Sequence, residues 1–275
     1  MALSRNIKLY AGAGIVLFIL FVGLLAPWIA PHDPLAQNLI DRLKPPIWMS
    51  GGSSEYLLGT DNYGRDLLSR LIYGARVSLL IATASMLLSC AVGVVAGMLA
   101  GFKQGKWEVV IMRLADAHSA FPQILLAIVA VAAMGGGMLN LILVLGVSQW
   151  MIYARVIYNM TRAVRERSFI EAARSFGARD AYLLRRHIFP QLVPVVIVLA
   201  TLQVAQMILQ ETALSFLGLG VPQPALTWGN VLAEGRDRLF GAPWIANSAG
   251  IAIVVLVLAV NLVGSGLRQK LAPSN

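Results

Sequence analysis

The sequence predicts an all-α, polytopic membrane protein with six transmembrane helices. Of its 275 residues, 58% are hydrophobic and only 13% are charged, which is about half the charged fraction of a soluble domain. The charged residues are clustered, and they leave six apolar stretches of about the 20 residues that a helix needs to cross a bilayer. These stretches are 9–30, 78–101, 113–134, 139–159, 192–212 and 247–267.

Each stretch has a local feature that supports its interpretation as a helix. The stretch 9–30 is too long for the apolar part of a signal peptide and lacks a clear cleavage site, so we expect a retained span. Pro122 is expected to kink the third stretch, and the glycines at 135–137 predict a hairpin between the third and the fourth. Small residues recur every four positions on the second stretch, the pattern of a close helix-packing face: Gly93, Gly97 and Gly101.

The distribution of Lys and Arg predicts the orientation. With the N-terminus in the cytoplasm, the cytoplasmic segments hold 14 of these residues and the external segments hold 7. The positive-inside rule therefore favours cytoplasmic N- and C-termini, and Arg155, one turn inside the fourth stretch, can extend toward the same side. The net charge of +9 thus marks topology, and without a basic stripe interleaved with aromatic residues it does not indicate nucleic-acid binding.

This orientation divides the chain into two regions. Residues 1–77 form the first span and an external segment, whose part 66–76 reads as an amphipathic helix lying in the membrane interface. Residues 78–275 form a core of five spans with a cytoplasmic loop at 161–191 and a second external segment at 215–246.

The cytoplasmic loop predicts a helix–turn–helix. Ser168 and Glu171 have the spacing of a capping box that starts a helix. Gly177 suits the left-handed residue that ends it, and Asp180 suits the start of a second helix. The loop is expected to expose an apolar face, which requires a partner, through Phe169, Phe176, Tyr182 and Leu183.

The external segments read first as architecture. Thr60, Asp61 and Gly64 are turn residues, and Trp228 is interpreted as an interfacial anchor. The alternative is contact with another protein, for which the candidates are Arg65, Arg236 and Arg238.

Three motifs then resemble a known family. Glu171-Ala172-Ala173, followed by Gly177 and by a hydrophobic tail that ends at Pro190, resembles the coupling loop of ATP-binding-cassette importer permeases. His187 departs from the aliphatic residue usual there but keeps its bulk. Gly-Thr-Asp-x-x-Gly-Arg-Asp at 59–66 and the segment 215–229 resemble the dipeptide, oligopeptide and nickel branch.

The resemblance implies a type I importer permease in the bacterial cytoplasmic membrane, translocating di- or oligopeptides, with nickel complexes or glutathione as alternatives. It implies a second homologous permease subunit, forming a heterodimer, and an external solute-binding protein. It also implies two ATPase subunits, which bind the ATP and dock on Glu171, Ala172, Ala173, Gly177, His187 and Pro190.

The fifth stretch carries the candidate translocation pathway. Three amides share one helix face beside Glu211, namely Gln203, Gln206 and Gln210. Amides donate and accept hydrogen bonds, as a peptide pathway requires, but interhelical bonding explains them equally well. Asp116 is expected to pair with Arg113 on its own helix. An ion-coupled secondary transporter, the alternative class, requires deep acidic residues, for which only Asp116 and Glu211 qualify.

Catalytic and cofactor motifs are missing from the sequence. The glycine spacing at 101–106 does not fit a phosphate-binding loop, and Trp107 stands where Ser or Thr should follow. Three histidines and one cysteine, Cys90, show no catalytic or metal-ligand spacing. We therefore expect no enzyme activity, metal or cofactor in this chain, and we interpret Cys90 as a packing residue.

Overall fold

The computed structural model describes residues 2–271, which consist of helices and connecting loops with one isolated β-bridge between Thr60 and Asp66. The all-α prediction is confirmed. The elements are α1 (Ala2–Leu24), α2 (Ala26–Ile29), the 3₁₀ turn η1 (Leu39–Asp41), α3 (Leu67–Lys103), α4 (Gly105–Ser119), α5 (Gln123–Met134), α6 (Met138–Ser148), α7 (Trp150–Arg165), α8 (Ser168–Ser175), α9 (Asp180–Tyr182), the π-helical segment η2 (Leu183–Ile188), α10 (Phe189–Phe216), α11 (Trp228–Arg236) and α12 (Pro243–Leu271).

Five of the six predicted spans are present as long apolar helices: α1, α3, α6 with α7, α9 through α10, and α12. The prediction of a continuous third span was wrong. α4 ends at Ser119, α5 begins at Gln123, and the two helices meet at 88°. Pro122 lacks an N–H and disfavours a helical conformation at Phe121, so it breaks the helix instead of kinking it. The count reaches six when this bent pair is taken as one span.

The predicted interfacial helix at 66–76 is not a separate element. Asp66 caps α3, because its Oδ2 accepts a hydrogen bond from the Ser69 backbone at 2.8 Å. From there α3 runs without interruption to Lys103. Leu67 and Arg70, on opposite sides of the expected amphipathic pattern, are both buried, because protein covers this part of the helix.

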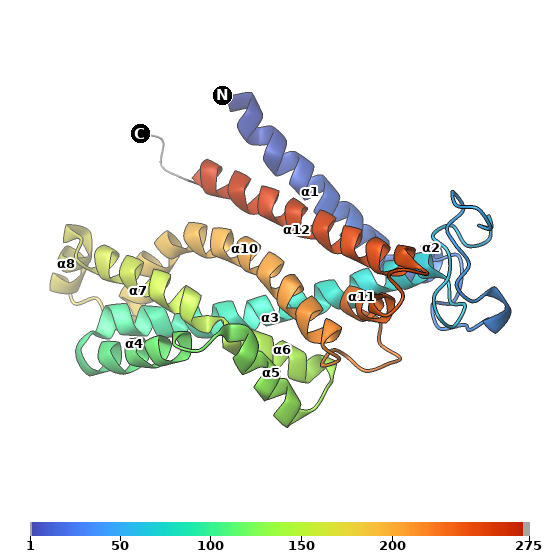
Figure 1. Ribbon diagram of the computed structural model, residues 1–275. Helices are drawn as coiled ribbons and strands as arrows, with labels where there is room; N and C mark the ends of the chain where they lie inside the picture. Colours follow the sequence, from blue (N-terminus) through green and yellow to red (C-terminus); the bar gives the residue numbers. More distant parts are fainter. Residues whose placement is uncertain (1, 272–275) are drawn as a thin grey trace.

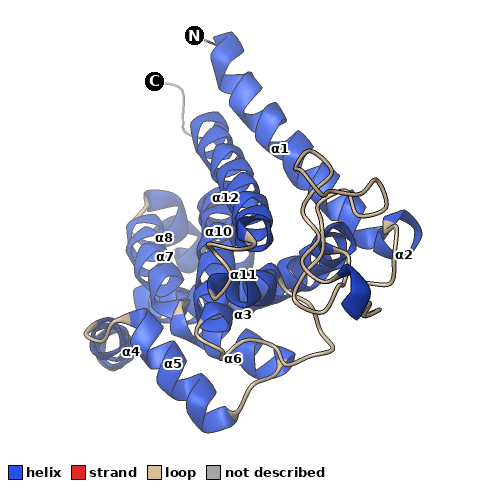
Figure 2. Cartoon of the chain, turned by 45° about the vertical axis from the view of Figure 1, so that its right-hand side comes forward, coloured by secondary structure: helices blue, strands red, loops and turns tan. Residues whose placement is uncertain are grey.

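The helices are arranged around α3, which contacts α6, α7, α10 and α12 (Figure 1). α1 packs along α12 and also touches α3. α8 lies at the far left of Figure 1, α1 begins and α12 ends at the top, left of the centre, and residues 31–66 lie at the right-hand end. In Figure 2 this loop after α2 is the longest stretch outside the helices.

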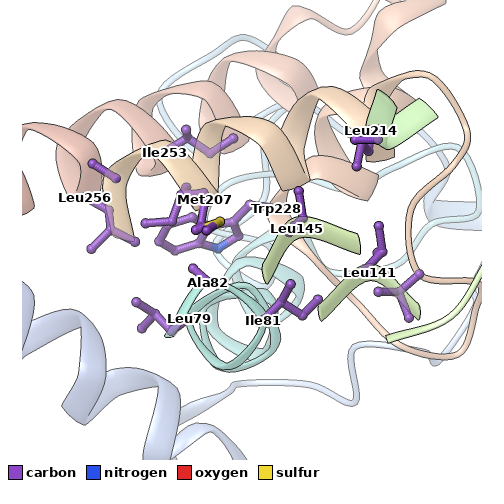
Figure 3. Packing of buried hydrophobic residues seen from close by; sticks show 14 of the residues in the cluster. Leu79, Ile81, Ala82, Leu141, Leu145, Met207, Leu214, Trp228, Ile253 and Leu256 are labelled. Carbon is purple, nitrogen blue, oxygen red and sulfur yellow. The ribbon is translucent and has the colours of Figure 1, made fainter. Parts of the chain in front are cut away.

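The apolar core lies where α3, α6, α10 and α12 meet (Figure 3). Trp228, at the start of α11, is 3% exposed within this cluster. Its indole donates to the Leu71 carbonyl at 2.8 Å, so the prediction of an interfacial anchor was wrong. The other labelled members are Leu79, Ile81, Ala82, Leu141, Leu145, Met207, Leu214, Ile253 and Leu256.

Glycines allow the closest helix contact and the tight hairpin. A Cβ on Gly97 would lie 2.6 Å from the Ala154 carbonyl oxygen of α7, and Gly93 and Gly101 face the same helix as closely. The predicted packing face is therefore confirmed. Gly135 and Gly137 have φ of +84° and +147°, which confirms the hairpin between α5 and α6 because other residues rarely adopt such angles.

Candidate functional site

The loop at residues 161–191, predicted to be cytoplasmic, folds around α8. The predicted capping box was wrong: Arg167 is the N-cap residue, Ser168 lies inside the first turn, and no side chain caps the helix. The predicted end is confirmed, because Gly177 has φ +84°. Its N–H donates to the Arg174 carbonyl at 2.9 Å, which satisfies one of the last carbonyls of the helix.

The loop stands on a buried apolar base. Ile170 of α8 and Leu183, Ile188 and Leu192 of the following helix are at most 1% exposed, in one cluster with Phe102. Leu183, which was predicted to be exposed, faces this base. Burying these side chains is favourable by roughly 1.5–3 kcal/mol each. The base therefore fixes the loop to the end of α3.

Ion pairs at the edge reinforce this attachment. Asp180, at the start of α9, lies 3.1 Å from Lys103 Nζ and 3.8 Å from an Arg174 nitrogen. The Arg174 guanidinium also lies 5.6 Å from the centre of the Phe102 ring. α9, η2 and α10 then form one continuous helical segment, Asp180–Phe216, so the second helix of the predicted helix–turn–helix is the beginning of the fifth span.

Pro190 accompanies the change from π to α geometry. The chain before it, η2, is π-helical, and the Phe189 N–H donates to the carbonyl of Leu184. Pro190 occupies the first turn of α10, where a helix tolerates proline.

The outer face of the loop is aromatic and exposed. Phe176 is 91% exposed and Tyr182 54% exposed. The rings of His187 and Tyr182 pack edge-on, with 5.5 Å between their centres, and the centre of the His187 ring lies 6.2 Å from that of the Phe169 ring. The other predicted positions, Glu171 and Ala172, are exposed, and Ala173 is half-buried against the base.

This face is also basic. Arg179, Arg185 and Arg186 surround Tyr182 in a hollow of about 530 Å³. None of the three forms an ion pair within the described part of the chain, and neither does Glu171. The face is an apolar surface ringed by unneutralised charges, as a protein contact surface requires.

The predicted glutamine face is divided in the structure. Gln203 is buried and its Nε2 lies 3.5 Å from Gln149 Oε1, at the junction of α6 and α7. Gln210 is 3.4 Å from Gln123 Oε1, at the start of α5, whereas Gln206 is exposed. Gln149 and Gln123 were not predicted, although isolated amides in apolar stretches are a usable signal.

The two acidic candidates both have partners within the chain. Glu211 is 1% exposed and accepts a hydrogen bond from Ser215 Oγ at 2.7 Å. Asp116 pairs with Arg155 of α7 at 2.9 Å, so the predicted pairing with Arg113 was wrong. Arg155 also donates to Ser119 at 3.1 Å and thereby ties the end of α4 to α7.

The motif at residues 59–66 takes part in a buried ion network. Arg65 Nε donates to Asp61 at 2.6 Å and its Nη2 donates to Glu234 of α11 at 2.8 Å. Arg70 bonds Asp61 and both oxygens of Glu234. The arginines are at most 1% exposed, so Arg65 is unavailable for external contacts, whereas Arg236 and Arg238 are exposed.

No group of three or more His, Cys, Asp or Glu side chains within residues 2–271 is arranged to hold a metal ion. The features that the structure does assemble are the aromatic and basic face of the loop, the continuous helix behind it, and the interhelical amide pairs. They describe a membrane protein that meets another protein at one end.

Comparison with known proteins identifies its class. Residues 93–275 match the family described as the binding-protein-dependent transport system inner membrane component. The chain belongs to this family and is a multi-pass permease subunit of an ATP-binding-cassette importer. Residues 2–46 match a second family, the N-terminal transmembrane domain of oligopeptide transport permease C.

Relatives cover nearly the whole chain. The chain is 41% identical to the di/tripeptide transport system permease protein DppC of Pseudomonas aeruginosa over 98% of its length and 89% of that protein. It is 38% identical to the glutathione transport system permease protein GsiD of Pectobacterium atrosepticum, over 98% and 88%. The fold is similar to the inward-facing MetNI methionine transporter, with TM-score 0.62 and 18% identity over 75% of this chain and 98% of that chain.

Proposed function

We propose that this chain is one of two related permease subunits of a peptide importer, and that it translocates di- or oligopeptides delivered by an external solute-binding protein. The 41% identity to a di/tripeptide permease over nearly the whole chain supports this substrate class. Glutathione, named for a 38% identical relative, is itself a modified tripeptide and fits the same class. Nickel complexes remain the alternative substrate.

We also propose that the N- and C-termini lie in the cytoplasm. The excess of Lys and Arg in the segments on that side supports this orientation. It is also supported by the packing of α1 along α12, which brings the start of α1 near the end of α12 and so favours termini on the same side (Figures 1 and 2).

The observation that carries the coupling proposal is the exposed aromatic face of the loop on its rigid base. Phe176, 91% exposed in this chain, requires an apolar partner groove, and the three arginines around Tyr182 favour acidic residues at its rim. An ATPase subunit with such a groove takes up the loop through Glu171, Ala172, Ala173, Gly177, His187 and Pro190. ATP binds to that subunit, and the permease changes conformation through the docked loop.

Substitutions on the loop test this coupling. Phe176→Ser removes the most exposed ring, and Gly177→Val strains the left-handed helix end at φ +84°. Both variants should insert into the membrane normally but lose the ATPase subunits during purification. Glu171→Ala combined with Ala173→Asp should do the same. The matched control is Phe240→Ser, also fully exposed but on the loop before α12, which should keep the ATPase.

Wild-type ATPase stoichiometry and normal substrate-stimulated hydrolysis in the Phe176 and Gly177 variants would rule out the coupling role. Uptake of a labelled dipeptide, glutathione and a nickel complex by the reconstituted complex separates the substrates. Uptake of nickel alone would remove the peptide proposal and leave the coupling proposal intact.

The pathway proposal rests on the exposed member of the glutamine face. If Gln206 lines the pathway, Gln206→Leu should lower peptide uptake without changing the melting temperature. Gln203→Leu is the matched control, because it breaks a buried interhelical bond and should lower stability by ~0.6 kcal/mol or somewhat more. Normal uptake in Gln206→Leu assigns the whole face to packing.

A further inference from the structure

A cavity of about 660 Å³ lies at the end of the molecule opposite α8, between three parts of the chain. One wall comes from residues between 27 and 35, the second from Tyr73 and Arg76 on α3, and the third from residues 224–226 before α11. The first wall belongs to the segment that matches the permease C N-terminal domain, and the third to the segment that matches the core family. The cavity is thus at the junction of two modules.

The cavity carries one cation and one anion that do not neutralise each other. Arg76 and Asp33 both line it and both are exposed. Neither forms an ion pair with any residue between 2 and 271, so more than 4 Å separates their charged atoms. Asp33 Oδ1 accepts only the Leu35 backbone N–H, at 2.9 Å. The cavity therefore offers one guanidinium and one carboxylate to a ligand that carries both a negative and a positive group.

The depth of the cavity in the membrane follows from the packing of α1 on α3. A Cβ on Gly23 would lie 3.2 Å from the backbone nitrogen of Arg76. Gly23 is at the end of the apolar run Ile7–Leu24, so Arg76 lies where hydrocarbon gives way to lipid headgroups. Trp28 of α2 is 82% exposed, and tryptophan is typical of that level.

We propose that this cavity binds the headgroup of a zwitterionic phospholipid of the phosphatidylethanolamine type. The guanidinium of Arg76 holds the phosphate, for which arginine is well suited, and the carboxylate of Asp33 holds the ammonium. Leu35, which lines the cavity and is 40% exposed, and Trp28, next to the lining residue Pro27, provide apolar surface for the acyl chains. This surface favours a lipid over a free zwitterionic peptide. The lipid joins the N-terminal module to the core.

Two substitutions with opposite consequences test the site in the purified full-length complex. Bound lipid is counted by native mass spectrometry after reconstitution with equal amounts of phosphatidylethanolamine and phosphatidylglycerol. Arg76→Gln should lower retention of both lipids about tenfold, because it removes the phosphate contact. Asp33→Asn should keep a phospholipid but change the preference from phosphatidylethanolamine to phosphatidylglycerol by a similar factor.

The matched control is Arg42→Gln, which removes an exposed arginine of the same external segment that does not line the cavity. This variant should retain the same amount of each lipid as the wild type. An unchanged melting temperature shows that each variant is folded. Unchanged lipid retention in Arg76→Gln, or an unchanged preference in Asp33→Asn, overturns the proposal. Displacement of the lipid by millimolar dipeptide or inorganic phosphate assigns the cavity to a soluble ligand and also overturns it.

Discussion

The two ends of the molecule use charged sequence motifs in opposite ways. At the end that holds residues 31–66, the side chains of Arg70 and Asp61 are both 0% exposed and pair with each other, and Arg70 also pairs with Glu234. At the α8 end, the burial is apolar, and Glu171 and three arginines face outward without an ion pair within residues 2–271. A motif whose charges are neutralised inside its own chain is architecture, whereas one whose charges lack partners there is a contact surface.

Removing one charge from the external network should have the largest effect on stability. Arg70→Met removes one of the two arginines that neutralise the buried Asp61, and it breaks the bidentate pair with Glu234. Breaking a buried pair costs about 3–5 kcal/mol, so the melting temperature of the purified protein should fall sharply. Arg238→Met, on an exposed arginine, is the control. Equal melting temperatures for the two variants would place the network outside the folded core.

The base of the cytoplasmic loop should respond next. Ile170→Ala empties a site that is 1% exposed and should cost about 2–5 kcal/mol. Because the base fixes the loop, trypsin should cleave more quickly after Arg174 and Arg179 in this variant. Phe169→Ala, on the neighbouring and 40% exposed side chain, should leave the cleavage rate unchanged. Equal cleavage of both variants would show that the loop is held by its partner alone.

The smallest effect concerns the ion pair between Lys44 and the largely buried Asp41, in the loop after α2. Lys44, hydrogen-bonded to Asp41, lowers the pKa of that carboxyl, and the Tyr56 hydroxyl, 3.2 Å away, adds to the effect. Because the pKa in the folded state lies below that of the unfolded chain, the pair stabilises the fold at neutral pH. This contribution is lost as the pH falls through the lowered pKa.

Melting curves at several pH values measure this contribution. Asp41→Asn should lower the melting temperature slightly at neutral pH, and the difference from wild type should vanish in acid. Asp237→Asn, on an exposed residue, should show a smaller difference at neutral pH. A difference for Asp41→Asn that grows toward acid contradicts the assignment.

The features that were predicted correctly from the sequence depend on residues that lie close together along the chain. The spans follow from apolar length, and the packing of Gly97 on α7 follows from a four-residue spacing within one helix. The left-handed conformation of Gly177 follows from its place after a short helix. The lipid environment and the local backbone geometry restrict which residue types can occur at these positions. Each feature can therefore be recognised within a single segment.

The errors concern residues whose surroundings come from distant segments. Arg70 and Glu234 are 164 positions apart, so nothing near either residue indicates that Arg65 and Arg70 are buried together. Leu183 was placed on the exposed face because helix periodicity does not say which face another element covers. Asp116 had a plausible partner at Arg113, but the break at Pro122 and the packing of α4 on α7 gave it Arg155 instead.

The helical segment from Asp180 to Phe216 has a further consequence for timing. Its 37 residues extend over about 55 Å at 1.5 Å per residue, so tilting it by one degree about one end moves the other end by about 1 Å. No loop interrupts it, but it holds Pro190 and, one turn further on, Pro194 inside α10, where a backbone hydrogen bond is missing. A push on the cytoplasmic end therefore reaches the opposite end in the same step, unless bending at Pro194 absorbs it. The stiffness of a single turn decides whether the two sides of the membrane act simultaneously or in sequence.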